Sequence, residues 1–255
     1  MHKPPVPRRR VADWIAGSSR LAALALAGGL TLSTPAAWAA TAEPLGMAHK
    51  RIEQAQASAA AARDFQLFVR RSLDTHGGTL PDGFPFEVND LQDLQRARLA
   101  YGFEVHTIEP QDLLDSGAEL SQRVKPTGTW RFVVQLEGRP IGLVTVQQHN
   151  GRWESIAFGA AVLAKDVDAV MQRHANSARS NVRFIRVFQA QSDFLEVQDP
   201  NPGRSARFAP LVSARESLLL QAQRGGGAEP AGLTEAAELL EPLRAAVRKN
   251  LDSFR

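Results

Sequence analysis

The sequence predicts an α+β fold in which an antiparallel sheet of about five strands, with a three-stranded meander at its centre, packs against helices. Three observations predict it. Residues 130–136 alternate apolar and polar side chains with a period of two, the pattern of a strand with one buried face. Turn sequences follow at residues 137–140 and 149–152, and the second contains Asn150 and Gly151, a strong hairpin signal. Residues 160–174 then show the apolar period of a helix.

The second turn sets an expected register for the meander. If Asn150 and Gly151 form a two-residue turn, Leu143 pairs with Phe158 and shares a face with Phe132. We predict that this face belongs to the core. Its members are Trp130, Phe132, Val134, Leu136, Ile141, Leu143, Ile156 and Phe158.

The opposite face of the meander is half apolar and provides the predicted binding site. Apolar surface of this kind is covered either by another helix of the same chain or by a partner or ligand, and both interpretations stay open. Aromatic and arginine side chains are typical of interface hot spots. The candidate binding residues are Arg131, Val133, Val144, Val146 and Trp153.

Residues 1–39 have the layout of an export signal peptide. Three arginines at positions 8–10 precede an apolar stretch at 21–32, and Ala37 and Ala39 give a small-x-small cleavage pattern. The apolar stretch is too short to span a bilayer stably. The alternatives are an uncleaved amphipathic anchor, and a twin-arginine instead of a general secretory signal. Cleavage by either export route predicts a periplasmic or secreted protein without a stable membrane span.

The chain has a formal net charge of +3, but much of its basic character belongs to the N-terminal segment. Residues 1–39 hold five basic residues and one acidic residue, so 25 basic and 26 acidic residues remain after cleavage. A nearly neutral chain attracts phosphate backbones weakly, which argues against a nucleic-acid partner. The sequence has no cysteine, and this excludes disulfides, thiolate nucleophiles and zinc–thiolate sites.

The residues before the meander predict two helices, a strand and two irregular segments. A helix over 47–73 carries an apolar stripe from Ile52 to Leu73. Phe84 and Phe86, in a loop over 77–88, either plug a gap in the core or bind a ligand. A helix over 90–100, a strand over 102–108 and a helical turn beginning at Pro110 follow. Residues 116–128 are polar, and we expect an irregular connection there.

The residues after the meander complete a predicted single domain over 40–223. We expect a helix over 160–174, a strand over 181–189, an apolar run of undecided type at 193–197, a loop at 199–203, and a strand at 208–212 that leads into a helix through residue 220. A flexible linker at 224–232 precedes a helical tail at 233–255, which Pro242 should kink or split. The tail either docks on the domain or contacts a partner.

From Val182 onward, the sequence shows a strand, an acid-bearing turn, a strand containing Arg207, Phe208, Ala209 and Pro210, and a short helix. This order is loosely similar to repeats of an organelle import-translocon family. The similarity covers about a third of the chain, and no function or residue role is taken from it.

The sequence contains no contiguous motif for catalysis, phosphate binding or a cofactor. The five histidines after residue 39 are not spaced for a shared metal on one helix or strand. Asp199 and the residues after it imitate a calcium loop, but prolines interrupt it and Pro210 stands where a bidentate acid is needed. We therefore predict no catalytic motif, no cofactor and no metal site.

These observations favour an exported, non-catalytic binding or accessory protein of the periplasm or cell envelope that acts through a sheet face. Its partner would be an envelope protein or a small apolar ligand. One alternative is an enzyme, hydrolase-like, with a site assembled around His106 and either Glu104 or Asp112. Another is a structural interaction protein that acts through its C-terminal helix.

Overall fold

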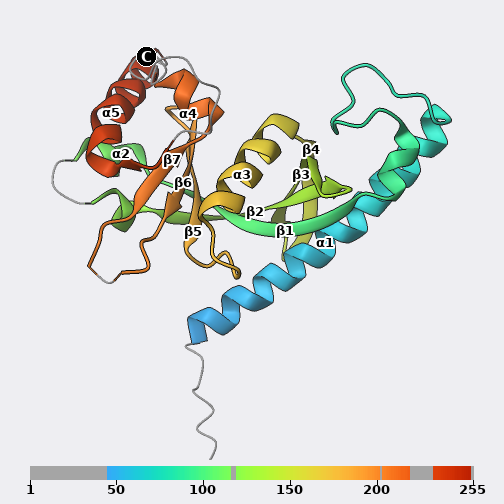
Figure 1. Cartoon of the computed structure of the whole chain (residues 1–255), viewed down its shortest axis with the longest axis horizontal. Coiled ribbons are helices and arrows are strands. Elements are labelled where there is room, and N and C mark those ends of the chain that lie inside the picture. Colours follow the sequence, from blue (N-terminus) through green and yellow to red (C-terminus); the bar gives the residue numbers. More distant parts are fainter. Residues whose placement is uncertain (1–44, 116–118, 202, 219–231, 254–255) are drawn as a thin grey trace, which may run out of the picture. The chain divides into compact units, whose positions relative to one another are not determined.

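A computed structural model describes residues 45–115, 119–201, 203–218 and 232–253. It confirms the predicted α+β class, since helices pack on a mostly antiparallel sheet (Figure 1). The sheet has eight strands in the order β4-β3-β2-β1-β5-β6-β7-β8. Their bounds are β1 (Arg98–Thr107), β2 (Lys125–Leu136), β3 (Arg139–His149), β4 (Arg152–Gly159), β5 (Val182–Val187), β6 (Ser192–Val197), β7 (Arg207–Pro210) and β8 (Thr234–Glu235).

Five α-helices and two 3-10 helices accompany these strands within the described ranges. They are α1 (Leu45–His76), η1 (Leu91–Gln95), α2 (Pro110–Leu114), η2 (Leu120–Arg123), α3 (Ala161–His174), α4 (Val212–Ser217) and α5 (Ala236–Ser253). None of these helices has the length and hydropathy that a membrane span requires. The predicted signal peptide, and residues 224–231 of the predicted linker, lie outside the described residues.

The predicted meander forms from β2, β3 and β4 (Figure 1). It lies at one edge of an eight-stranded sheet, however, and not at the centre of a sheet of about five strands, because β1 and the four strands from β5 to β8 all extend the sheet on the β2 side. Its second turn has positive φ at both Asn150 (49°) and Gly151 (77°), the backbone that a two-residue hairpin turn needs. His149 pairs with Arg152, as this turn requires.

The predicted register beyond the turns is wrong, because each hairpin contains a bulge. Near Ile141 the pairing of β3 with β2 shifts by one residue, so Leu143 pairs with Val133 and lies on the other face from Phe132. Near Ile156 the pairing of β4 with β3 shifts again, and Leu143 pairs with Gly159. A bulge inverts the alternation of side chains beyond it. Ile156 is 57% exposed for this reason and does not belong to the core.

Helix α1 covers the face of the meander that carries Trp130, Phe132, Val144 and Val146. The helix buries three alanines together with Phe65, so its stripe is rotated from the predicted one, and Ile52 is 55% exposed. The buried alanines are Ala57, Ala60 and Ala61, whose small side chains let the helix approach the sheet closely.

The loop between α1 and η1 closes one end of this core, which confirms the plug interpretation. Phe86 is 2% exposed and packs edge-on against Phe65, with ring centroids 5.4 Å apart. It also lies over Gly142, where a Cβ atom would be 2.5 Å from the Phe86 ring. Only glycine fits at position 142 without displacement of this ring.

Two further apolar clusters complete the core. One lies between α5 and the strands β5 to β7, and it includes Ile185, Phe194 and Leu243. The other lies under α3, on the face opposite α1, and it includes Phe103, Val133 and Phe184. We call the second surface the α3 face of the sheet. Strand alternation places α1 and α5 on the other face, since neighbouring residues of β5 divide between the two clusters.

Several predicted elements differ from the observed ones. Residues 90–100 form η1 and the start of β1 instead of one helix, and residues 120–128 form η2 and the start of β2 instead of an irregular connection. The undecided run at 193–197 is the central strand β6, which is buried along its length. The predicted tail contributes β8 and α5 to the same sheet and core, and α5 continues through Pro242 without a break.

Candidate functional site

The five predicted binding residues divide between the two faces of the sheet. Val144, Val146 and Trp153 pack under α1, whereas Val133 packs under α3. The three valines are completely buried. The Trp153 indole is half-buried, and its Nε1 donates a hydrogen bond of 3.3 Å to Oε1 of Gln56 in α1. These four side chains therefore serve the core, and the structure does not bring the five together as one surface.

Arg131 lies on the α3 face, because it is two residues before Val133 in β2. Its Cζ atom is 5.3 Å from the centre of the Phe184 ring. Its Nε and Nη1 atoms are buried and have no hydrogen-bond partner among the described residues. Burial lowers the pKa of Arg131, an effect that Asp193 opposes and Arg186 reinforces. Thr129, two residues earlier in β2, shares this face and lines a groove.

That groove lies at the ends of the one parallel pair among the described strands. Val105 and His106 of β1 pair in parallel with Phe184 and Ile185 of β5. After β1 the chain returns to β2 on one side, whereas after β5 it turns to β6 on the other side (Figure 1). Connections that leave neighbouring parallel strands in opposite directions open a crevice at their carboxyl ends, a frequent position for ligand sites.

We call this crevice the switch groove. It has a volume of about 440 Å³. The last residue of β1 and residues that follow β1 and β5 line it, together with residues from the start of β2 and the end of β3. They are Thr107, Glu109, Lys125, Pro126, Thr127, Thr129, Gln147, Phe188 and Gln189.

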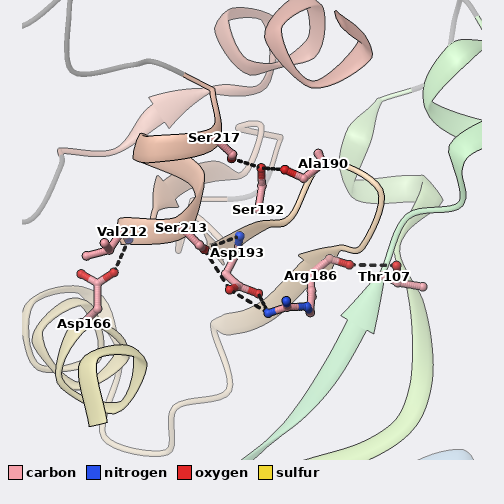
Figure 2. A network of polar contacts seen from close by, with 9 residues as sticks. All are labelled: Thr107, Asp166, Arg186, Ala190, Ser192, Asp193, Val212, Ser213 and Ser217. Atoms are coloured by element: carbon pink, nitrogen blue, oxygen red, sulfur yellow. Dashed lines mark hydrogen bonds and ion pairs between the residues drawn. The ribbon is translucent and has the colours of Figure 1, made fainter. Parts of the chain in front are cut away.

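Phe188 is exposed on a turn that the rest of the molecule holds in place. The side chain is 51% exposed, and Cζ of Arg186 is 5.7 Å from its ring centre. The turn closes with a hydrogen bond of 3.1 Å from the Gln191 amide to the Phe188 carbonyl. Ser192 Oγ donates to the Ala190 carbonyl at 2.9 Å (Figure 2). The Asn250 side chain of α5 donates to the carbonyl of Gln189, so the turn is fixed to both sheet and helix.

Threonine hydroxyls fix the strands that form the other walls. Thr107 Oγ1 donates a hydrogen bond of 2.8 Å to the Arg186 carbonyl, across the parallel pair (Figure 2). Thr127 Oγ1 donates to the Val105 carbonyl at 2.7 Å and accepts from the Thr129 amide at 3.3 Å. The groove is therefore largely formed before any ligand arrives.

The charged groups around the groove are mostly paired with one another. Lys125 Nζ lies 2.7 Å from Asp112 Oδ2, and this hydrogen bond raises the pKa of Lys125. Arg186 Nη1 contacts both carboxylate oxygens of Asp193 at 3.0 Å (Figure 2). Among the lining residues, the cation of Lys125 and the anion of Glu109 balance, so the lining has no net charge.

The neutral polar side chains of the lining remain available for a ligand. The structure gives no side-chain hydrogen bond within the described residues for Gln147 or Gln189. Both amides can donate and accept at once. Thr107 and Thr127 use their hydroxyl protons internally and keep acceptor lone pairs.

The alternative acid–base site around His106 is a closed cluster on the opposite face. His106 is 8% exposed, and its Nε2 lies 3.5 Å from Glu104 Oε2, which also binds Lys50 Nζ at 3.0 Å. Burial lowers the pKa of His106, and the charge of Glu104 opposes this effect. Asp112 pairs with Lys125 at the switch groove, and His106 is not a lining residue of that groove.

No group of three or more histidine, aspartate and glutamate side chains within the described ranges is arranged to hold a metal ion. Sequence reasoning missed Phe188, Gln147 and Gln189 as site residues. The local signal for Phe188 was weak, since one more aromatic at the end of an apolar strand is indistinguishable from core. The groove itself depends on the β1–β5 pairing, which has no local signature.

Comparisons of the chain with protein-family models, with curated proteins and with solved structures find no match.

Proposed function

We propose that this chain is an exported, non-catalytic binding or accessory protein of the periplasm or cell envelope, and that it binds an envelope component in the switch groove. The proposal keeps the hypothesis of a binding site on a sheet face, but it places the site where β1 and β5 end. The observation that carries it is the exposed Phe188 on an anchored turn, beside a preformed groove at the ends of the parallel strands.

The chemistry of the lining favours binding over catalysis. Hydroxyl and amide groups at neutral pH form hydrogen bonds but do not transfer protons efficiently, whereas general acid–base catalysis needs a group that titrates near the working pH. Lys125 is ion-paired with Asp112, and Glu109 is an exposed carboxylate beside it. Seven of the nine lining residues have polar side chains, which favours a ligand with hydrogen-bonding groups over the small apolar ligand that the sequence suggested.

The third function, an interaction through the C-terminal helix, receives less support. The apolar side of α5 is already used inside the molecule, where Leu239, Leu243 and Val247 are at most 2% exposed. A partner would have to use the opposite, polar side of this helix or displace it from the core.

The test is an NMR titration of the mature, isotope-labelled protein with a soluble fraction of its native cell envelope. We expect amide shifts confined to the lining of the switch groove, above all at Thr129, Gln147 and Gln189. Shifts centred on Glu104 and His106 would support the enzyme alternative, and shifts along α5 the structural one. A spectrum unchanged by every envelope fraction would contradict the proposal.

A further inference from the structure

We propose that the switch groove binds a neutral, polyhydroxylated ligand, that is, a segment of an uncharged glycan. This inference rests on the proposed function, because it names the chemical class of ligand for the same groove. Three features of the groove lead to it: an exposed aromatic ring, neutral side chains that can donate and accept, and the absence of net charge among the lining residues.

The exposed ring of Phe188 provides a platform for the apolar face of a sugar ring. Half of this side chain is in contact with solvent although the turn that carries it is fixed. Covering the ring would recover the cost of exposing apolar surface, and a rigid platform loses little conformational freedom on binding. A sugar ring combines apolar C–H groups on its faces with hydroxyl groups on its edges, so it suits a ring surrounded by polar side chains.

The hydrogen-bonding groups around Phe188 match hydroxyl groups. Each hydroxyl of a sugar both donates and accepts, and the amides of Gln147 and Gln189 do the same. Thr107 and Thr127 offer acceptor lone pairs from hydroxyls that are already oriented by backbone carbonyls. These side chains come from four different segments, so they can contact one ligand from several sides.

Charged ligands fit the groove less well. The guanidinium of Arg186 is held by Asp193, and the ammonium of Lys125 is held by Asp112. The remaining carboxylate, that of Glu109, would repel an anion at the rim. A cation would give up its hydration beside Lys125, where the nearby carboxylates of Asp112 and Glu109 already face a positive charge. A neutral ligand avoids this repulsion, and desolvating its hydroxyl groups costs less than desolvating an ion.

An extended peptide is also disfavoured, because peptides add to the edges of sheets. The edges of this sheet are β4 and β8, whereas the groove lies at the ends of central strands. The volume of about 440 Å³ falls within the usual range for small-ligand sites, about 300–1,000 Å³.

The experiment uses the full mature chain and saturation-transfer NMR with calorimetry. The probes are a panel of neutral tetrasaccharides (gluco-, galacto-, manno- and N-acetylglucosamine types in both anomeric linkages), their sulfated counterparts, and a neutral extended peptide. We expect at least one neutral tetrasaccharide to bind and its sulfated form to bind at least tenfold more weakly. In Phe188→Ala the affinity for the neutral probe should fall at least tenfold, and in Gln147→Ala by several-fold.

The matched control is Val162→Ala, which truncates an apolar side chain of α3 that is 64% exposed, and it should bind as the parent does. Melting curves verify that each variant is folded. The inference is overturned if no neutral tetrasaccharide binds, if the peptide or a sulfated probe binds more tightly, or if Phe188→Ala leaves the affinity unchanged. If the panel is silent while the envelope fraction still shifts the groove amides, the ligand class is wrong and the proposed function stands. Silence in both experiments contradicts both.

Discussion

Asp193 is the counter-charge for two guanidinium groups near the switch groove, those of Arg186 and Arg131. Its carboxylate is almost completely buried, contacts Arg186 at 3.0 Å with both oxygens, and accepts a hydrogen bond of 2.8 Å from Ser213 Oγ (Figure 2). Its charge also counteracts the lowering of the Arg131 pKa by burial. Arg131 has no ion pair of its own among the described residues. A single carboxylate thus compensates two neighbouring guanidinium groups.

We expect Asp193→Asn to lower the free energy of unfolding by about 2–4 kcal/mol, because it leaves a partly buried arginine without its counter-charge. Urea denaturation at neutral pH measures this change. Asp82→Asn, at an exposed position, is the control and should stay within about 0.5 kcal/mol of the parent. If Asp193→Asn lowers the free energy of unfolding by less than about 1 kcal/mol, water solvates Arg186 almost as well as the carboxylate does, and the account is contradicted.

His106 should make stability depend on pH. Burial lowers its folded-state pKa below the ordinary value near 6.5, and Lys50 and Arg183 act in the same direction while Glu104 opposes them. As the pH falls, the unfolded chain therefore takes up a proton at this histidine before the folded chain does. The free energy of unfolding that the neutral, buried His106 contributes is complete above about pH 6.5, and it is lost as the pH falls through the folded-state pKa.

We expect the free energy of unfolding to fall between pH 7 and pH 5, and to fall less steeply in His106→Gln. Urea denaturation of both proteins across this range measures the two slopes. Part of the slope should remain in the variant, since burial also lowers the pKa of His174. Equal slopes in the two proteins would contradict a histidine that is held neutral in the folded state.

At the scale of elements, helix α1 protects the edge strand β4. Arg63 Nη2 donates to the Trp153 carbonyl at 3.2 Å, and Asp64 Oδ2 accepts from the Ser155 amide at 2.8 Å. These are backbone groups of an edge strand, which an added strand from another molecule would otherwise use. The bulge near Ile156 interrupts the same edge further along.

Replacing Asp64 by alanine should expose part of this edge. We expect Asp64→Ala to lower the free energy of unfolding by about 1–2 kcal/mol and to increase self-association at high protein concentration. Denaturation and size-exclusion chromatography with light scattering measure the two effects. Asp74→Ala, at an exposed position of the same helix, should change neither. A stable monomer after Asp64→Ala would show that Arg63 and the bulge protect the edge without Asp64.

The local sequence predicted an element correctly where a single feature, such as a turn sequence or an apolar period, was enough to define it. The Asn150–Gly151 turn, the helix over 160–174 and the plug formed by Phe86 follow from such signals. The register of the meander does not, because Leu143 and Val144 are both apolar and both buried, on opposite faces. When both faces are apolar, the alternation no longer shows where a bulge inverts it. The predicted sheet-face site was therefore assembled from residues of two faces.

At the scale of the whole molecule, the site depends on a pairing between distant segments. Strands β1 and β5 are separated by the entire meander and α3, so no local pattern indicates that they are neighbours. The predicted fold class and the buried helices could be derived from periodicity. The groove could not, because it exists only where the parallel pair ends and its connections diverge.

The C-terminal helix is part of this whole, and its removal should unfold the second half of the sheet. Leu243 of α5 is 2% exposed in the cluster with Phe194 and Phe208. We expect Leu243→Ala to lower the free energy of unfolding by about 2–5 kcal/mol. Leu251→Ala, on the same helix but 38% exposed, is the control and should cost less than about 1 kcal/mol. Equal small effects at both positions would contradict a docked helix.

The central claim is that the switch groove is where this protein meets its ligand, and photo-crosslinking in intact cells tests it most directly. A photoreactive amino acid replaces Gln147 in the groove or Val162 on the exposed side of α3. We predict adducts with an envelope component at position 147, their loss when Phe188→Ala is added, and none at position 162. Equal adducts at both positions, or adducts at 147 that persist without Phe188, would contradict the claim.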